Sequence, residues 1–222
     1  PDVLTLGIAA TYIDAGAAIS TDYFAFDAHN LDAIDFDFIQ LVGSSSPVFA
    51  TSETIGTIAS ANIISGANIV EYTTKSYRYY RLQITIGDAG GFTVRPIIGV
   101  FYAGEKFNLS EGIRPSYTPP KNGVVSDVLN SKSNTGNFIG RSLKRSGYQF
   151  TIKNEFVPVA WMVSNWNNLL IDIEVNPFFF LWNDLYPDDA VFCWTVGKIG
   201  KPLYTDQQYM SFKFQCNGYR SV

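Results

Sequence analysis

The stretch from Tyr77 to Glu105 constrains the fold most, because its pattern is that of two extended strands joined by a tight turn. Between Tyr80 and Ile86 apolar residues alternate with Arg, Gln and Thr, as in a strand with one buried face. Residues 88–91 (Asp-Ala-Gly-Gly) favour a turn, since glycine adopts the positive φ angles that tight turns need. A more apolar run follows over residues 92–102. The stretch therefore predicts two long strands at the centre of an all-β domain.

The composition also favours sheets. The chain has 222 residues, with 17 Phe, 13 Tyr and 4 Trp against 2 Met. Aromatic side chains suit pleated, half-buried surfaces. No apolar run approaches the ~20 residues of a membrane-spanning helix, and the first residues lack the pattern of a signal peptide. We therefore expect no membrane insertion and a protein folded in the cytoplasm.

A proline-rich segment predicts a division into two domains. Residues 114–123 contain three prolines, which remove backbone donors and fix φ, so this segment suits neither a helix nor an inner strand. It predicts a linker between a β-sandwich of residues 1–113 and a smaller β-rich domain of residues 124–222.

The second domain is predicted to contain strands and one helix. Residues 139–148 and 149–153 have the pattern of two paired strands. A helix is expected near residues 158–173, ended by Asn176 and Pro177. Its apolar residues recur at three- and four-residue steps: Val159, Met162, Val163, Trp166, Leu169, Leu170 and Ile173.

Charge is distributed unevenly along the chain. Residues 1–74 contain nine Asp or Glu and no Lys or Arg, whereas residues 75–222 have a net charge of +5. The densest basic cluster is Arg141, Lys144 and Arg145. Complementary potentials favour register between subunits. We therefore predict these three residues as a subunit interface that meets the acidic first third, the alternative being unrelated solvated surfaces.

The sequence offers little for catalysis or cofactor binding. His29 is the single histidine, which excludes a multi-histidine metal site, and it is expected to hydrogen-bond a loop at the end of a strand. Cys193 and Cys216 lie in apolar surroundings without metal or redox spacing, and are expected to be buried free thiols. We assign no catalytic residue, no cofactor and no metal ligand, and the acidic chain does not favour nucleic acid.

Two hypotheses, one on carboxylates and one on aromatic residues, remain open. Asp35 and Asp37 lie on one face of an extended segment and could form a glycosidase pair, as in a depolymerase. Sugar binding would need exposed aromatic rings, but all four tryptophans are predicted to face a core: Trp161, Trp166, Trp182 and Trp194.

A resemblance adds what composition and spacing do not. The run RYYRLQITIGDAGGFTVRPIIGVFYAGE, residues 78–105, resembles a segment of minor tail and distal tail structural proteins of tailed bacteriophages. Residues 28–31 (Ala-His-Asn-Leu) are similar to a turn in the galactose-binding-like domain of those proteins. Residues 140–142 (Gly-Arg-Ser) and the aromatic segment 190–198 are similar to their second half.

The resemblance implies a galactose-binding-like N-terminal domain and a structural role. Because such domains often bind calcium through loop carboxylates, it also implies that Asp27, Asp32, Asp35 and Asp37 could hold one ion. We expect a non-enzymatic virion component, assembled in the host cytoplasm as a ring-forming distal tail or baseplate adaptor at the tail tip. Its expected partners are copies of itself and the tube, hub and fibre proteins of the tail. The alternative is a receptor-recognition module that binds host surface glycan.

Overall fold

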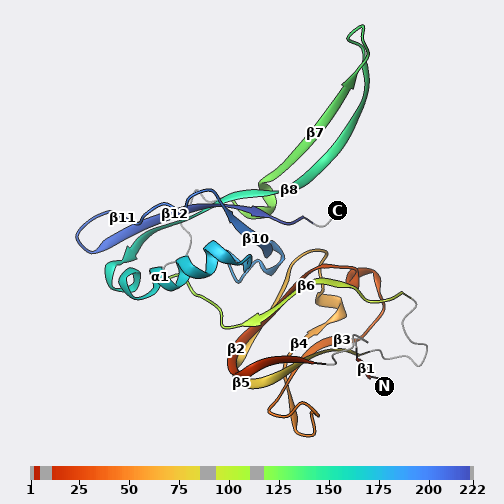
Figure 1. The fold of residues 1–222 in the computed structure, drawn as a ribbon, viewed down its shortest axis with the longest axis vertical. Coiled ribbons are helices and arrows are strands. Elements are labelled where there is room, and N and C mark those ends of the chain that lie inside the picture. The colour runs from red at the N-terminus through yellow and green to blue at the C-terminus, as the bar shows by residue number, and fades with distance from the viewer. Residues whose placement is uncertain (1–2, 6–11, 86–93, 111–117, 221–222) are drawn as a thin grey trace. The chain divides into compact units, whose positions relative to one another are not determined.

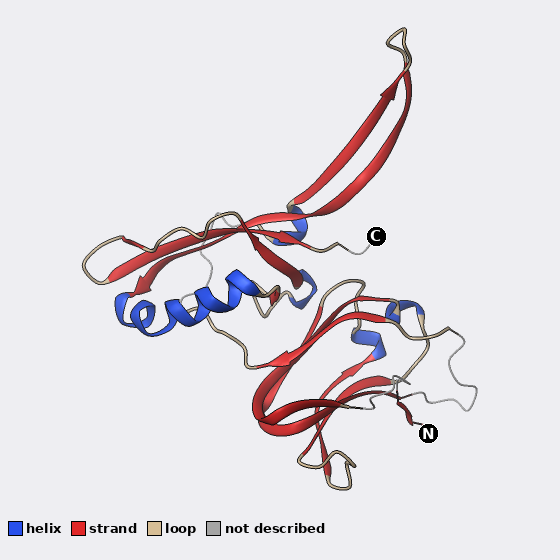
Figure 2. Cartoon of the chain, viewed as in Figure 1, coloured by secondary structure: helices blue, strands red, loops and turns tan. Residues whose placement is uncertain are grey.

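The computed structural model describes residues 3–5, 12–85, 94–110 and 118–220 (Figure 1). These residues form mostly β-strands, arranged in two sheets, together with one α-helix (Figure 2). The chain divides into two compact units, Pro1–Phe107 and Asn108–Val222. The predicted mainly β fold with one helix is confirmed. The predicted linker begins outside the described residues, and its second half contains the short 3-10 helix Pro120–Asn122.

The first unit holds one six-stranded sheet in the order β4-β3-β5-β2-β6, with β1 also paired to β5. The central strand β5 contains the alternating residues that the sequence singled out. The prediction of a central pair is wrong, because β2 lies between β5 and β6 and makes β6 an edge strand. The strands are β1 (Val3–Thr5), β2 (Ile13–His29), β3 (Phe38–Ser44), β4 (Ser52–Ala59), β5 (Asn68–Thr85) and β6 (Ile98–Gly104).

This sheet curves so that its two halves face each other, in the manner of a sandwich. The register of β2 against β5 shifts between Asp14 and Ile19, where Gly16 has a φ of 79°, and Figure 1 shows β2 and β5 curving together. A Cβ on Gly56 of β4 would lie 2.9 Å from the ring of Phe24 on β2, so the two layers touch. The core between them comprises Phe24, Phe26, Leu31, Ile34, Phe36, Ile39, Leu41, Ile55, Tyr80 and Ile84.

The second unit holds a sheet in the order β7-β8-β12-β10-β9, with β11 paired to β12. β8 is one continuous strand, and the prediction of two paired strands within it is wrong. Its first half pairs with β7 and its second half with β12, so no turn is needed between them. The strands are β7 (Val124–Lys132), β8 (Phe138–Pro158), β9 (Phe178–Phe180), β10 (Val191–Val196), β11 (Leu203–Tyr204) and β12 (Tyr209–Gly218).

The helix α1 (Val159–Val175) begins directly after β8 and buries Met162, Leu169 and Ile173. Asn176 caps its C-terminus by donating its N–H to the carbonyl of Asp172. The core beneath it combines α1 with the sheet: Phe150, Ile152, Val157, Met162, Leu169, Ile173, Phe180, Val191, Cys193, Phe212, Phe214 and Cys216. Among the described residues no helix has the length and hydrophobicity needed to cross a membrane.

Candidate functional site

The second unit includes a long two-stranded hairpin that contributes none of its described side chains to the buried core. We call this hairpin the β-arm and define it as residues 124–147. It contains β7, the polar turn after it and the first half of β8 (Figure 1). At ~3.3 Å per residue, the nine residues of β7 extend about 30 Å. β12 pairs with β8 only from Tyr148 onward, so both edges of the β-arm are open. An isolated two-stranded ribbon is marginally stable in water.

The β-arm exposes large apolar side chains on both of its faces. Directly paired residues share a face of a ribbon, so Leu143, opposite Val128, and Phe138, opposite Lys132, lie on one face. Leu129, opposite Ser142, lies on the other. Leu143 is 57% exposed, Phe138 65% and Leu129 48%. No described side chain of the β-arm is buried. Exposed apolar side chains beside open strand edges are typical of surfaces that contact another molecule.

The predicted interface residues all lie on the β-arm. Arg141 and Lys144 are exposed, and within the described part of the chain neither forms an ion pair. Arg145 pairs with Asp127 in the strand register, and its side chain lies outside what the structure describes. With Lys132 as the fourth basic residue and Asp127 as the single acidic one, the β-arm has a net charge of +3.

The acidic first third is less available than its sequence suggests, because three of its carboxylates already have basic partners. Asp14 accepts from Arg78 at 2.9 and 3.1 Å. Glu53 accepts from Lys75 at 2.6 Å, and Glu71 from Lys106 at 2.6 Å. The Arg78 guanidinium lowers the pKa of Asp14, and the hydrogen bond from Lys75, with a further one from Tyr77, lowers the pKa of Glu53.

Glu53 therefore provides a test of pH dependence. A carboxylate whose pKa is lowered by folding adds stability above its ordinary pKa of 4.5, and this stability is lost as the pH falls through the lowered value. Glu53→Gln should melt slightly below the wild type at pH 7, and the difference should vanish on acidification. Thermal melts of both proteins from pH 7 to pH 3 measure it. A difference that stays constant over that range would contradict the assignment.

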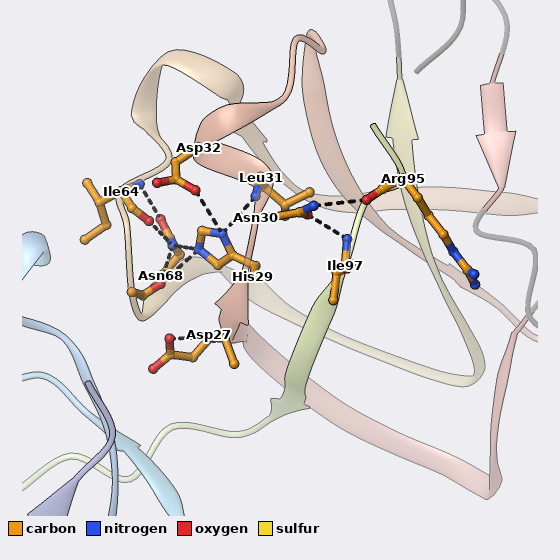
Figure 3. Close-up of polar contacts among 11 residues, drawn as sticks. Asp27, His29, Asn30, Leu31, Asp32, Ile64, Asn68, Arg95 and Ile97 are labelled. Carbon is orange, nitrogen blue, oxygen red and sulfur yellow. Dashed lines mark hydrogen bonds and ion pairs between the residues drawn. The ribbon is translucent and has the colours of Figure 1, made fainter. Parts of the chain in front are cut away.

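His29 organises the chain after β2, as the sequence predicted, and both ring nitrogens are engaged (Figure 3). Its Nδ1 accepts from the Leu31 N–H at 3.2 Å, and its Nε2 lies 3.0 Å from the Gly66 carbonyl oxygen and 2.9 Å from Nδ2 of Asn68. Asn68 completes the cluster: its Nδ2 donates to the carbonyls of Gly66 and Ile64, and its Oδ1 accepts from the Ile64 N–H. These contacts hold a loop together, and the imidazole has no exposed surface.

The four carboxylates considered for calcium do not converge. Asp27 is buried, whereas Asp32, Asp35 and Asp37 are exposed. Among the described residues no three His, Cys, Asp or Glu side chains lie close enough together to hold a metal ion. Ile34 and Phe36, which alternate with these carboxylates, are buried in the first core. Asp35 and Asp37 therefore point to solvent, while the residues that alternate with them point into the core.

The cysteine prediction is confirmed, and the tryptophan prediction is wrong for one residue. Cys193 and Cys216 are free and fully buried, and burial raises the pKa of Cys193 well above its ordinary value. Trp161, Trp166 and Trp182 pack partly buried against the second core. Trp194 instead is 41% exposed, because its neighbours Cys193 and Thr195 point to the other face of β10.

The sequence reasoning missed two features of the site. Its strand prediction covered most of the β-arm but did not indicate that these strands lack a covering layer. The available signal was that apolar residues occur at both odd and even positions of 124–129. It also missed Asn68, whose position after a Gly-Ala dipeptide, next to a strand, was typical of a turn-stabilising amide.

Comparison of the chain with protein-family models, with curated proteins and with solved structures found no match.

Proposed function

We propose that this chain is a non-enzymatic structural subunit that associates with copies of itself through the β-arm. The observation that carries the proposal is the exposure of apolar side chains on both faces of a ribbon whose edges are also open. Leaving that area in water costs free energy that burial against a partner recovers, at ~25 cal/mol per Å². The hairpin is therefore a segment that association stabilises.

The setting of this assembly is proposed from the resemblance of residues 78–105 to phage tail proteins. On that basis the subunit belongs to a ring at the tail tip of a tailed-phage virion, as a distal tail or baseplate adaptor. A closed ring requires heterologous contacts, in which two different patches of each subunit meet. Immunogold labelling of purified virions, with an antibody against this chain, should place it at the tail tip; a virion without label would remove this part of the proposal.

Self-association is tested by charging the β-arm. The double variant Leu129→Asp with Leu143→Asp places one carboxylate on each face, at positions that are 48% and 57% exposed. Because both side chains are solvent-accessible, the fold should keep its stability to within about 0.5 kcal/mol. The concentration at which the protein associates should rise at least tenfold, since each buried contact then includes an unpaired charge.

The measurement is sedimentation equilibrium over a wide concentration range, beside thermal melts. The matched control is Leu203→Asp, which charges a more exposed leucine, 68% accessible, on β11 outside the β-arm. It should associate like the wild type. A wild type that stays at its 24.6 kDa monomer mass throughout, or equal weakening by the control, would contradict the proposal.

A further inference from the structure

The outer side of α1 carries three large apolar side chains that the unit itself does not cover, and we call them the stripe. Val163, Ile171 and Val175 lie within about 120° of the helix circumference, an arc that they share with the exposed polar residues Ser164, Asn167 and Glu174. Val163, Ile171 and Val175 are 78%, 64% and 77% exposed. The sequence assigned Val163 to the buried side, but the contacts with the sheet are made by Met162, Leu169 and Ile173 instead. Surface helices usually place polar residues on this side.

The stripe continues into a groove at the C-terminal end of α1. The groove has a volume of about 460 Å³ and includes Val175, the last residue of the stripe. Trp194 of β10, the exposed tryptophan, contributes to its wall. Glu174, Pro177 and Phe192 also line the groove. We call the stripe and this groove together the receiving face.

The receiving face has the charge opposite to that of the β-arm. Residues 159–177 contain Asp172 and Glu174 and no Lys or Arg. The groove also lies at the C-terminus of α1, where the helix dipole adds partial negative charge and favours cations. The β-arm has a net charge of +3. Leu143, Arg141 and Phe138 lie on the same face of its ribbon, because their partners Val128, Asn130 and Lys132 are two residues apart on β7. Apolar surface and charge are therefore complementary on the two features.

We propose that the β-arm of one copy lies on the receiving face of the next copy. Leu143 and Phe138 cover the stripe and enter the groove, and Arg141 and Lys144 lie near Asp172 and Glu174. This inference rests on the proposed self-association and specifies the surface involved. The two patches differ, so the contact is heterologous and repeats from subunit to subunit, as a ring requires.

The acidic surface of the first unit fits the β-arm less well. Asp32, Asp35 and Asp37 supply exposed charge, but the large apolar residues between them, Ile34 and Phe36, are buried in the core. That segment therefore offers no large exposed apolar side chain to cover the β-arm. The receiving face offers both, and it is the partner that the observations favour.

Cross-linking between two single-cysteine variants tests the contact. Leu143→Cys on the β-arm and Val175→Cys on α1 are made separately, mixed and treated with a short bifunctional maleimide. The native cysteines are fully buried and should not react, as the wild type will verify. The mixture should give a covalent dimer containing one copy of each variant. Leu143→Cys mixed with Leu203→Cys is the matched control and should give at least fivefold less.

A charge swap adds a second readout. Glu174→Lys should weaken association about fivefold or more, whereas Glu174→Gln should have a smaller effect. Mixing Glu174→Lys with Lys144→Glu should restore association. Wherever residue 144 of one variant meets residue 174 of the other variant, the two side chains then have opposite charges. Two variants that stay as weak together as apart would overturn the assignment of this pair of surfaces.

The remaining outcomes separate this inference from the function on which it rests. An associating wild type in which Leu143→Cys links only to itself would overturn the receiving face and leave self-association standing. A monomeric wild type without cross-links would overturn both. Saturable quenching of tryptophan fluorescence by host polysaccharide, lost in Trp194→Ala and accompanied by no Val175 cross-link, would show that the groove binds glycan instead.

Discussion

Phe24→Ala should destabilise the first unit by about 3–5 kcal/mol, the range for removing a large buried aromatic side chain. Phe24 has no exposed surface. The centroid of its ring lies 6.2 to 6.4 Å from the ring centroids of Phe26, Tyr72 and Phe101. It also contacts the opposite layer of the sheet at Gly56. Alanine would leave a cavity between the two layers that neither strand can close alone. Domains have a total stability of only about 5–15 kcal/mol.

Differential scanning calorimetry measures this effect. The transition of the first unit should fall by at least 10 °C, since 1 kcal/mol shifts a domain of this size by roughly 4–8 °C. Phe138→Ala is the matched control, because it removes the same atoms from a ring that is 65% exposed on the β-arm. Its first-unit transition should stay at the wild-type temperature, because residue 138 belongs to the second unit. A shift of similar size in both variants would show that the effect does not come from burial between the layers.

Sequence patterns located most strands of the first unit but not their order. Alternation along β5 correctly indicated a buried face, on which Tyr80 and Ile84 lie in the core. The pattern identifies the face and not the neighbouring strand, and the insertion of β2 between β5 and β6 depends on contacts distant in sequence. Pro96 lies just before β6, in agreement with its exclusion from ladder positions that need a donor.

The second unit shows the same limit for helices and for covering layers. The three- and four-residue steps located α1 to within two residues of its C-terminus. They did not show that Met162 is buried and Val163 exposed. Adjacent apolar residues fit the helical period equally well, so the pattern does not decide which of the two faces the core. The continuous strand β8 extends beyond the end of β12 and pairs there with β7 alone, which forms the β-arm. Local patterns contain no information on where a second layer is missing. The basic residues of the β-arm were found because charge clustering is local in sequence.

Asn68→Leu should destabilise the first unit by about 2–3 kcal/mol, although leucine has nearly the same size and is more hydrophobic. Asn68 is 4% exposed and makes three hydrogen bonds of 2.8 to 3.0 Å with backbone groups of Ile64 and Gly66. The Gly66 carbonyl would keep its contact with His29, but the Ile64 N–H and carbonyl would lose this partner. An unsatisfied buried polar group costs about 1–3 kcal/mol, and partial access of water reduces this cost.

Urea unfolding gives the free energy, and hydrogen exchange gives its location. The amides of Ile64 and Leu31 should exchange faster in Asn68→Leu, because the loop that His29 and Asn68 hold together would open more often. Asn62→Leu is the matched control, as it makes the same chemical change at an exposed position of the 3-10 helix Ser60–Asn62. It should unfold within about 0.5 kcal/mol of the wild type. If Asn68→Leu did the same, the cluster around His29 would not be what orders the chain after β2.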